Sequence, residues 1–353
     1  MRITFVLPGF ISVPMGGVKV VHEYANRLSE KGHVVSLVYP IHLQTNFRYL
    51  LKKILVNQYD RCTGNNRELY YTPNPKVSVL TVKKICDKYI PDADAVIAAG
   101  WQTAEPVSRL PDVCGKKFYL LQHFETYFRS KKQVLETFHL PMKKIAIAQW
   151  IINELKNIGQ DAEGPIGNAI DHKEFYLEAN IPERTTDVIA VYHYMNVKGP
   201  RDLITTLKNL KKRKNISATV VSARKPIHRF PVWVKIIIRP PIPELRKIYS
   251  SSKVFLHTSH SEGWGLPVLE AMACGCAVVA TENRGVKEYL IPNQNAMMVP
   301  IGDTDALTTQ VNYLLTDYHQ RKLLVENGLK TVSQFSWKSS VLILENILLR
   351  NTE

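Results

Sequence analysis

Two glutamates flank a glycine turn in the stretch "SEGWGLPVLEAMACGCAVVA", residues 261–280. Glu262 precedes the turn, and Glu270 lies eight positions later in a segment that has Pro267 near a helix start. The first turn of a helix leaves backbone N–H groups unpaired and carries positive dipole, so this pattern predicts an anion site. Because a carboxylate is unfavourable beside a phosphate, we expect both glutamates to accept hydrogen bonds from the hydroxyls of a ribose or a sugar. A purely structural turn is the alternative.

The elements that must position this turn alternate along the chain. An apolar run at 3–9, a glycine loop, a helical pattern ending at Gly32 and an apolar run at 33–40 predict a β-α-β unit. Further buried strands are expected, with helices between them, at 95–100, 117–123 and 144–149. Continuous apolar strands between helices predict a parallel sheet that is covered on both faces.

A second series of the same kind follows a stretch rich in Gly, Pro and Asn at 163–184. Its strands are expected at 187–194, 216–223, 234–240, 253–259 and 276–281, and its helices at 200–213, 243–251, 267–274 and 303–316. The sequence therefore predicts an α/β protein with two doubly wound domains, 1–170 and 180–336. The ligand is expected where the carboxyl ends of the strands meet.

The length and composition fit two globular domains. The chain has 353 residues, of which 45% are hydrophobic and 22% are charged, and no apolar run approaches the length of a membrane-spanning helix. Its first ten residues predict a buried strand rather than a signal peptide, so we expect a cytoplasmic protein. Five scattered cysteines, without C-x-x-C or zinc-finger spacing, indicate neither disulfides nor structural zinc.

The net charge of +15 points to an anionic partner, which is a nucleic acid, an anionic membrane face or an anionic small substrate. Basic clusters lie at 47–58, 129–132 and 208–215, and each is either a solvated helix face or a contact with anionic lipid headgroups. The first cluster has apolar residues at helical spacing beside Lys52 and Lys53, as an interfacial helix requires. We expect peripheral contact with the inner face of an anionic membrane and no nucleic acid partner.

Several segments together resemble the family-4 retaining glycosyltransferases, which have the GT-B fold of two Rossmann-like domains facing across a cleft. The stretch at 259–290 is similar to the E-x7-E signature of that family, with Glu262 and Glu270 as its acidic pair. Other segments similar to family motifs follow in the family's order: "GGVKVVHEYANRLSEKGHVVSLV" at 16–38, "KFYLLQHFE" at 117–125, "IAIAQWIINELKNIG" at 145–159, "PIGNAIDHKEF" at 165–175 and "NVKGPRDLI" at 196–204. The resemblance also implies that a helix at about 337–353 crosses back onto the first domain.

The resemblance assigns roles residue by residue. Glu270 would hold the ribose diol of the donor, and Glu262 would hold the transferred sugar. Lys198 would neutralise charge on the leaving diphosphate, and His123 would face the donor sugar, although its position alone also fits a core histidine. The implied catalytic residues are His123, Lys198 and Glu262, and the implied donor-binding residues are Gly16, Gly17, His193, Arg224, Arg239, Gly263, Trp264, Gly265, Leu266 and Glu270.

The sequence departs from the family at His193. The family usually has an arginine there, five residues before the lysine of its Lys-Gly motif. Arginine is a permanent bidentate cation for phosphate, whereas histidine is cationic only part of the time near neutral pH. Either His193 substitutes for the arginine weakly, or Arg224 or Arg239 at neighbouring strand ends supplies the charge.

A metal site is not expected. Asp92 and Asp94 have the D-x-D spacing with which other glycosyltransferases bind manganese, but they lead into a strand of the first half rather than a nucleotide loop. Stabilisation of the leaving group is then left to Lys198 and the helix amides. We expect no cofactor.

The function implied by the resemblance is retaining transfer of a sugar from a nucleoside diphosphate sugar to a glycan or lipid-linked acceptor, in surface polysaccharide or glycoconjugate biosynthesis. The donor would bind the C-terminal domain and the acceptor the N-terminal domain. A nucleotide-sugar epimerase on the same scaffold is one alternative. A non-catalytic module that binds a sugar nucleotide or a glycan is the other, and the departure at His193 supports considering it.

Overall fold

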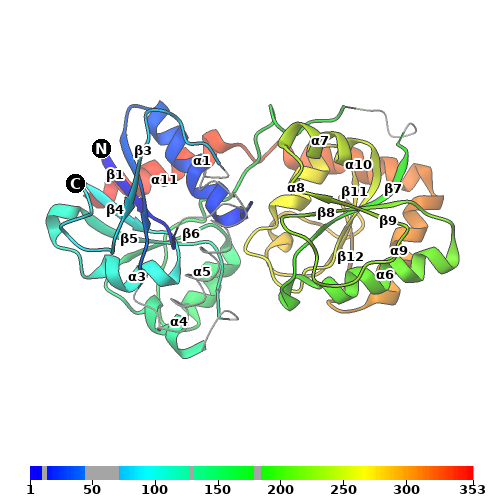
Figure 1. Ribbon diagram of the computed structural model, residues 1–353, viewed down its shortest axis with the longest axis horizontal. Coiled ribbons are helices and arrows are strands. Elements are labelled where there is room, and N and C mark those ends of the chain that lie inside the picture. Colours follow the sequence, from blue (N-terminus) through cyan, green and yellow to red (C-terminus); the bar gives the residue numbers. More distant parts are fainter. Residues whose placement is uncertain (10–13, 44–70, 127–130, 179–183, 353) are drawn as a thin grey trace, which may run out of the picture. The chain divides into compact units, whose positions relative to one another are not determined.

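The computed structural model describes residues 1–9, 14–43, 71–126, 131–178 and 184–352. The basic cluster at 47–58 and residues 129 and 130 of the second cluster lie outside the described residues. The chain divides into two compact units (Figure 1). Unit 1 comprises Met1–Gly167 and Val341–Glu353, and unit 2 comprises Asn168–Ser340.

Unit 1 contains a parallel six-stranded sheet in the order β3-β2-β1-β4-β5-β6. Its strands are β1 (Arg2–Val6), β2 (Val34–Pro40), β3 (Ser78–Val82), β4 (Ala95–Ala98), β5 (Lys116–Leu121) and β6 (Lys143–Ala146). Its helices are α1 (Gly16–Glu30), α3 (Trp101–Ser108), α4 (Lys131–Phe138), α5 (Gln149–Lys156) and most of α11 (Trp337–Thr352). α1 lies on one face of the sheet, and α3 and α4 lie on the other (Figure 1).

Unit 2 contains a second parallel sheet of six strands, in the order β12-β11-β10-β7-β8-β9. Its strands are β7 (Thr186–Tyr192), β8 (Ala218–Ser222), β9 (Val234–Ile238), β10 (Ser252–His257), β11 (Ala277–Thr281) and β12 (Met297–Val299). Its helices are α6 (Pro200–Arg213), α7 (Ile242–Ser250), α8 (Leu266–Ala273), α9 (Thr304–Thr316) and α10 (Tyr318–Val332). α6 and α9 cover one face, and α7, α8 and α10 cover the other (Figure 1).

The two doubly wound parallel sheets confirm the predicted α/β class. The fully buried central strands read as continuous apolar runs: β4 and β11 have no exposed residue. Two edge strands were not predicted. β3 is largely exposed and β12 has only three residues, so neither gives the buried apolar run that marked the others.

Local signals explain where several helices begin. Asp303 caps α9 by accepting a hydrogen bond from the Ala306 N–H at 2.8 Å, and Asp317 caps α10 in the same way from Gln320 at 2.8 Å. α8 has seven buried residues out of eight, which is typical of a helix packed on several sides. Across the described ranges, no helix combines the length and apolar character needed to cross a bilayer.

Candidate functional site

The candidate site of unit 2 lies where its strand order reverses. β8 follows β7 along the chain and pairs on one side of it, whereas β10 pairs on the other side. In open α/β sheets, ligands bind outside the carboxyl ends of the strands at such a switch point. The loop after β7 carries Lys198, and the loop after β10 carries Glu262. The fold therefore brings together two residues that are distant in sequence and that the family resemblance assigns to one donor.

Hydrogen bonds hold these two loops against one another. The N–H groups of His260 and Ser261 both donate to the Val197 carbonyl, at 2.9 and 3.3 Å. The Thr258 hydroxyl donates to the carbonyl of Gly199 at 2.9 Å. Gly199 has a φ of 62°, and a Cβ there would lie 2.0 Å from the Thr258 carbonyl oxygen. Only glycine allows this approach, so Gly199 fixes the position of the neighbouring Lys198.

Lys198 and Glu262 form an ion pair at the switch point. The Lys198 Nζ lies 2.7 Å from Glu262 Oε2 and also donates to the Ser261 carbonyl at 3.3 Å. On the other side, His257 Nε2 lies 3.7 Å from Glu262 Oε1. The two charged side chains are only 23% and 14% exposed, so solvent screens their attraction less than it would at the surface.

The Glu262 carboxylate remains ionised throughout the physiological pH range. Burial alone would raise its pKa, but the Lys198 ammonium, His257 and hydrogen bonds from Lys198 and Ser259 lower the pKa to about 2. Burial lowers the pKa of His257 to about 4, because it outweighs the attraction of the Glu262 carboxylate. At neutral pH the cluster therefore contains an ammonium, a carboxylate and an uncharged imidazole.

The glycine turn leads from Glu262 into α8. Gly265 precedes the helix with a φ of 93°, and its carbonyl accepts a hydrogen bond from the Tyr289 hydroxyl at 2.9 Å. Leu266 is the first helical residue and Pro267 the second, so the first-turn amides lie at the predicted anion position. A Cβ at Gly285 would lie 2.5 Å from the Glu262 carbonyl, which shows how closely a second loop packs on this turn.

Trp264 packs inside the protein. Its ring is 6% exposed and lies 5.9 Å from the Tyr289 ring and 5.8 Å from the Phe335 ring, centroid to centroid. The side chain therefore supports the glycine turn.

Glu270 lies one turn into α8 and is 8% exposed. The Tyr249 hydroxyl, from α7, donates to its Oε2 at 3.5 Å. Burial, reinforced by the Glu270 charge, raises the pKa of Tyr249 well above its usual value, so this hydroxyl stays protonated and able to donate. A buried carboxylate at this place can accept hydrogen bonds from a diol.

His193 is uncharged at neutral pH. Burial and then the positive charge of Lys198 lower its pKa to about 4, with Glu262 opposing and Arg224 adding to the decrease. Its Nδ1 accepts a hydrogen bond from the Met195 N–H at 3.2 Å, which leaves the proton of the neutral ring on Nε2. At neutral pH His193 can therefore act as a neutral hydrogen-bond donor rather than as a cation.

The two arginines expected near His193 differ. Arg224 follows β8 and is close enough to His193 to affect its pKa. Arg239 follows β9 with an unusual φ of 50°, and its Nε donates to the Ala223 carbonyl at 2.7 Å. The charge of Arg224 therefore reaches His193, while the Arg239 side chain is hydrogen-bonded to the residue after β8.

The residues predicted in unit 1 lie at the carboxyl end of its own sheet. Gly16 is the first residue of α1, and the Gly17 carbonyl accepts a hydrogen bond from the Gln122 amide at 3.1 Å. His123 comes two residues after β5 and contacts Trp150 edge-on, with centroids 5.4 Å apart. His123 thus lies in the loop beyond the carboxyl end of its strand.

Asp94 of the D-x-D pair serves the fold. Asp94 accepts a hydrogen bond from the Arg2 N–H at 2.7 Å, and this bond is the main cause of its lowered pKa. Among the residues that the structure describes, no cluster of three or more His, Cys, Asp or Glu could hold a metal ion.

Sequence reasoning missed several residues around these sites. His257 lies in an expected strand, Tyr249 in an expected helix and Tyr289 in the 259–290 stretch, and none of them has a predicted role. Each reaches a polar partner through a hydroxyl or a ring nitrogen. Burial raises the pKa of Glu125, two residues after His123, to about 7. Only the polar tips of these side chains, at strand or helix ends, could have signalled them.

Comparison with known proteins finds a matching family model and several similar proteins. The model of the family described as "Glycosyl transferases group 1" matches residues 172–331, which lie within unit 2. O-antigen chain mannosyltransferase B of Escherichia coli is 30% identical over 107 residues, covering 30% of this chain and 28% of that protein. D-inositol 3-phosphate glycosyltransferase of Xylanimonas cellulosilytica is 24% identical over 168 residues, covering 44% and 40%. The chain thus matches less than half the length of either relative.

Solved structures match over the whole chain. Sucrose-phosphate synthase from Thermosynechococcus elongatus superposes with a TM-score of 0.74 at 15% identity, covering 99% of both chains. The Anabaena protein HepE, solved in complex with UDP and glucose, gives a TM-score of 0.74 at 17% identity, covering 99% of this chain and all of the other. The chain therefore has the GT-B fold of these proteins. More particularly, residues 172–331 match the model of the glycosyl transferases group 1 family.

Proposed function

We propose that the protein is a retaining glycosyltransferase that moves a sugar from a nucleoside diphosphate sugar to a glycan or lipid-linked acceptor. The observation that carries the proposal is the Lys198–Glu262 ion pair at the switch point of a group 1 domain, beside the N-terminus of α8. These two loops contain a cation and a helix start, which suit a diphosphate. They also contain an ionised carboxylate, which suits the hydroxyls of a sugar.

The donor would occupy unit 2 in three parts. The ribose diol would bind the buried carboxylate of Glu270, and the diphosphate would lie against the amides of residues 263–266. The transferred sugar would then lie near Glu262, whose Oε1 faces away from Lys198 toward His257. Ribose, diphosphate and sugar would thus lie in sequence from α8 back to the glycine turn. Glu270 would bind the ribose hydroxyls, and Glu262 would bind the sugar hydroxyls.

Lys198 would change partner during the reaction. In the structure, its ammonium is shared between Glu262 and the Ser261 carbonyl. A diphosphate that arrives between the two loops offers a stronger anionic partner, and negative charge grows on it as the bond to the sugar breaks. Lys198 then stabilises the leaving group, while Glu262, still ionised, accepts hydrogen bonds from the sugar.

His193 would donate one neutral hydrogen bond to the phosphate from Nε2. Lys198 and Arg224 would supply the positive charge that the missing arginine supplies elsewhere in the family. No resident metal or cofactor is needed in this scheme, because these cations and the α8 amides act on the leaving diphosphate.

Unit 1 would contribute the acceptor side and His123. A neutral imidazole at the end of β5 can hydrogen-bond a sugar hydroxyl where charge develops. With no carboxylate required as a covalent nucleophile, the departing phosphate would help to deprotonate the acceptor, and the configuration at the sugar would be retained. The acceptor would belong to surface polysaccharide or glycoconjugate biosynthesis, on the cytoplasmic side of a membrane.

A nucleotide-release assay tests this function. The protein is incubated with a panel of nucleotide sugars, with and without glycan and lipid-linked acceptors. We expect nucleoside diphosphate to be released in amounts that depend on acceptor, and the product linkage to have the configuration of the donor. An epimerised donor without release would instead support the epimerase, and saturable donor binding without turnover would support a binding module.

A further inference from the structure

One continuous stretch of unit 2 carries most of the protein's excess positive charge. Residues 203–243 contain ten Lys or Arg and no Asp or Glu, although the whole chain has a net charge of +15. Asp202 and Glu244, which bound the stretch, lie at the first turns of α6 and α7. The stretch comprises nearly all of α6, β8, the connection at 223–233 and β9.

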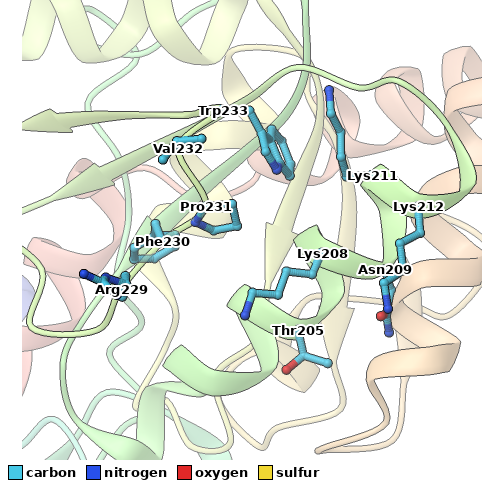
Figure 2. Close-up of a pocket in the computed structure, with 10 residues that line it drawn as sticks. All are labelled: Thr205, Lys208, Asn209, Lys211, Lys212, Arg229, Phe230, Pro231, Val232 and Trp233. Carbon is cyan, nitrogen blue, oxygen red and sulfur yellow. The ribbon is translucent and has the colours of Figure 1, made fainter.

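The basic side chains surround a hollow between α6 and that connection (Figure 2). The hollow has a volume of about 740 Å³. Thr205, Lys208 and Lys212 extend from α6 at helical spacing on one side, and Arg229 and Val232 lie on the other. We call the exposed side chains of 205–212 and 227–233 the basic rim.

The connection at 223–233 exposes its aliphatic residues. Ile227 is 75% exposed and Val232 is 104% exposed, as much as in an extended peptide. Their exposure is not the result of a loose loop. The Tyr192 hydroxyl is 2.7 Å from His228 Nδ1, and the Phe230 ring lies edge-on to Tyr192 at 5.3 Å. Alternate residues therefore anchor the connection on β7, and the residues between them are directed outward.

The chemistry of the exposed groups distinguishes among anionic partners. A single-stranded nucleic acid is usually bound by exposed aromatic rings on which bases stack. Here the Trp233 ring is covered by the Lys211 ammonium, 4.9 Å from its centroid, and Phe230 packs against the core. The groups that protrude are Ile227 and Val232, which favour an apolar surrounding. A second copy of the chain is disfavoured because two such rims would repel.

We propose that the basic rim docks on an anionic lipid membrane. Lys208, Lys212 and Arg229 would contact headgroup phosphates, and Ile227 and Val232 would enter the boundary between headgroups and acyl chains. Cations around protruding aliphatic side chains provide both forces that hold peripheral proteins on anionic bilayers. This surface goes beyond the proposed function, since it binds no donor or acceptor group by itself.

The rim is separate from the donor site within unit 2. Trp233 directly precedes β9, and Lys208 to Lys212 lie in the last half of α6, so these side chains of the hollow are near the amino ends of the strands. Lys198 and Glu262 follow the carboxyl ends of β7 and β10. Changes at the rim can therefore be tested without altering donor binding.

Vesicle sedimentation of the full chain tests the charges. Vesicles of phosphatidylcholine are compared with vesicles that also contain phosphatidylglycerol, at low and high salt. We expect binding only with the anionic lipid, weakened by salt. K208Q/K212Q should weaken binding about 25-fold, since each basic residue near an anionic surface contributes about 1 kcal/mol, or about fivefold. The matched control K322Q/K330Q removes two exposed lysines of α10 and should bind like the unaltered protein.

A second measurement tests insertion of the connection. V232S should weaken vesicle binding about 10- to 150-fold, the range expected for losing burial of one aliphatic side chain. V232W should show fluorescence that brominated acyl chains quench, whereas a tryptophan placed at the exposed Leu323 of α10 should not. Donor affinity, measured in parallel, should be unchanged in all these variants. Binding to neutral vesicles, equal binding of K208Q/K212Q and its control, or preference for DNA or an acidic glycan over anionic vesicles would each overturn the proposal.

Discussion

Units 1 and 2 have the same sheet topology but place different chemistry at their switch points. In each unit the first strand, β1 or β7, lies third from one edge, and the order reverses beside it. At that place unit 2 has the Lys198–Glu262 ion pair, whereas the described residues of unit 1 include the Gln122 amide on the Gly17 carbonyl and the edge-on contact of His123 with Trp150. The shared fold thus gives each unit a switch point, while the loops decide which charged groups lie there.

The buried histidines extend the comparison. In unit 1, His22 Nε2 lies 2.5 Å from the Tyr39 hydroxyl, with no carboxylate in that pair, and burial lowers its pKa to about 4. In unit 2, His257 has a similarly lowered pKa but lies beside Glu262. The first is a structural hydrogen bond in a sheet and helix core, and the second belongs to a charged site.

The largest expected effect comes from removing the unit 2 cation. Lys198→Met should lower kcat/KM for sugar transfer about 10²- to 10³-fold, equivalent to about 3–4 kcal/mol, because the charge on the leaving diphosphate loses its main stabilising group. Lys253→Met is the matched control, since Lys253 pairs with Asp187 at 2.8 Å but at the amino ends of the strands. Steady-state kinetics measure kcat/KM of both variants. An equal decrease of kcat/KM in the two would show that the cation at the switch point has no special role.

The next effect concerns the nucleotide. Glu270→Ala should weaken binding of the nucleoside diphosphate by about 1–3 kcal/mol, because the ribose hydroxyls lose a charged acceptor. Glu326→Ala on α10, which removes an exposed carboxylate 3.7 Å from Lys322, should leave binding unchanged. Titration calorimetry measures both. Unaltered affinity of Glu270→Ala would refute the ribose assignment.

The histidines predict a pH dependence of stability in both units. Their pKa of about 4 in the folded protein is below the usual 6.5, so the unfolded chain binds more protons between pH 6.5 and pH 4. The free energy of unfolding therefore falls as the pH falls through this window, by up to about 1.4 kcal/mol per pH unit for each histidine. His22→Phe should reduce this slope for unit 1 alone, as followed by hydrogen exchange of each unit. A slope that is unchanged in unit 1 would show that His22 titrates normally.

The smallest effect is expected at His193. His193→Ala removes one neutral hydrogen bond and should lower kcat/KM only about two- to twelvefold, the equivalent of about 0.5–1.5 kcal/mol. The pH profile of kcat/KM should lack an inflection near 6.5 that depends on His193, because its pKa is about 4. Such an inflection, lost in the variant, would show instead that His193 acts as the phosphate cation.

The sequence predicted the fold better than the details of the site. Apolar runs located ten of the twelve strands found among the described residues, and the glycine turn before Pro267 marked the α8 start. It could not show that Lys198 and Glu262 are paired, since they are 64 residues apart and meet only through the strand order. The neutral state of His193 also depends on burial and on Lys198, which no local pattern contains. The acid-free stretch at 203–243 was visible, but its outward aliphatic residues required the structure.

Gly199 has a consequence for mutational scanning. Any side chain at this position would collide with the Thr258 carbonyl. The loops that carry Lys198 and Glu262 would have to move apart to remove this collision. In a saturation library selected for transfer activity, we expect position 199 to accept glycine alone, although it offers no functional group to the substrate. Variants at this position should keep the folded sheet but lose the alignment of Lys198. A screen that measures only protein abundance would therefore not detect their loss of activity.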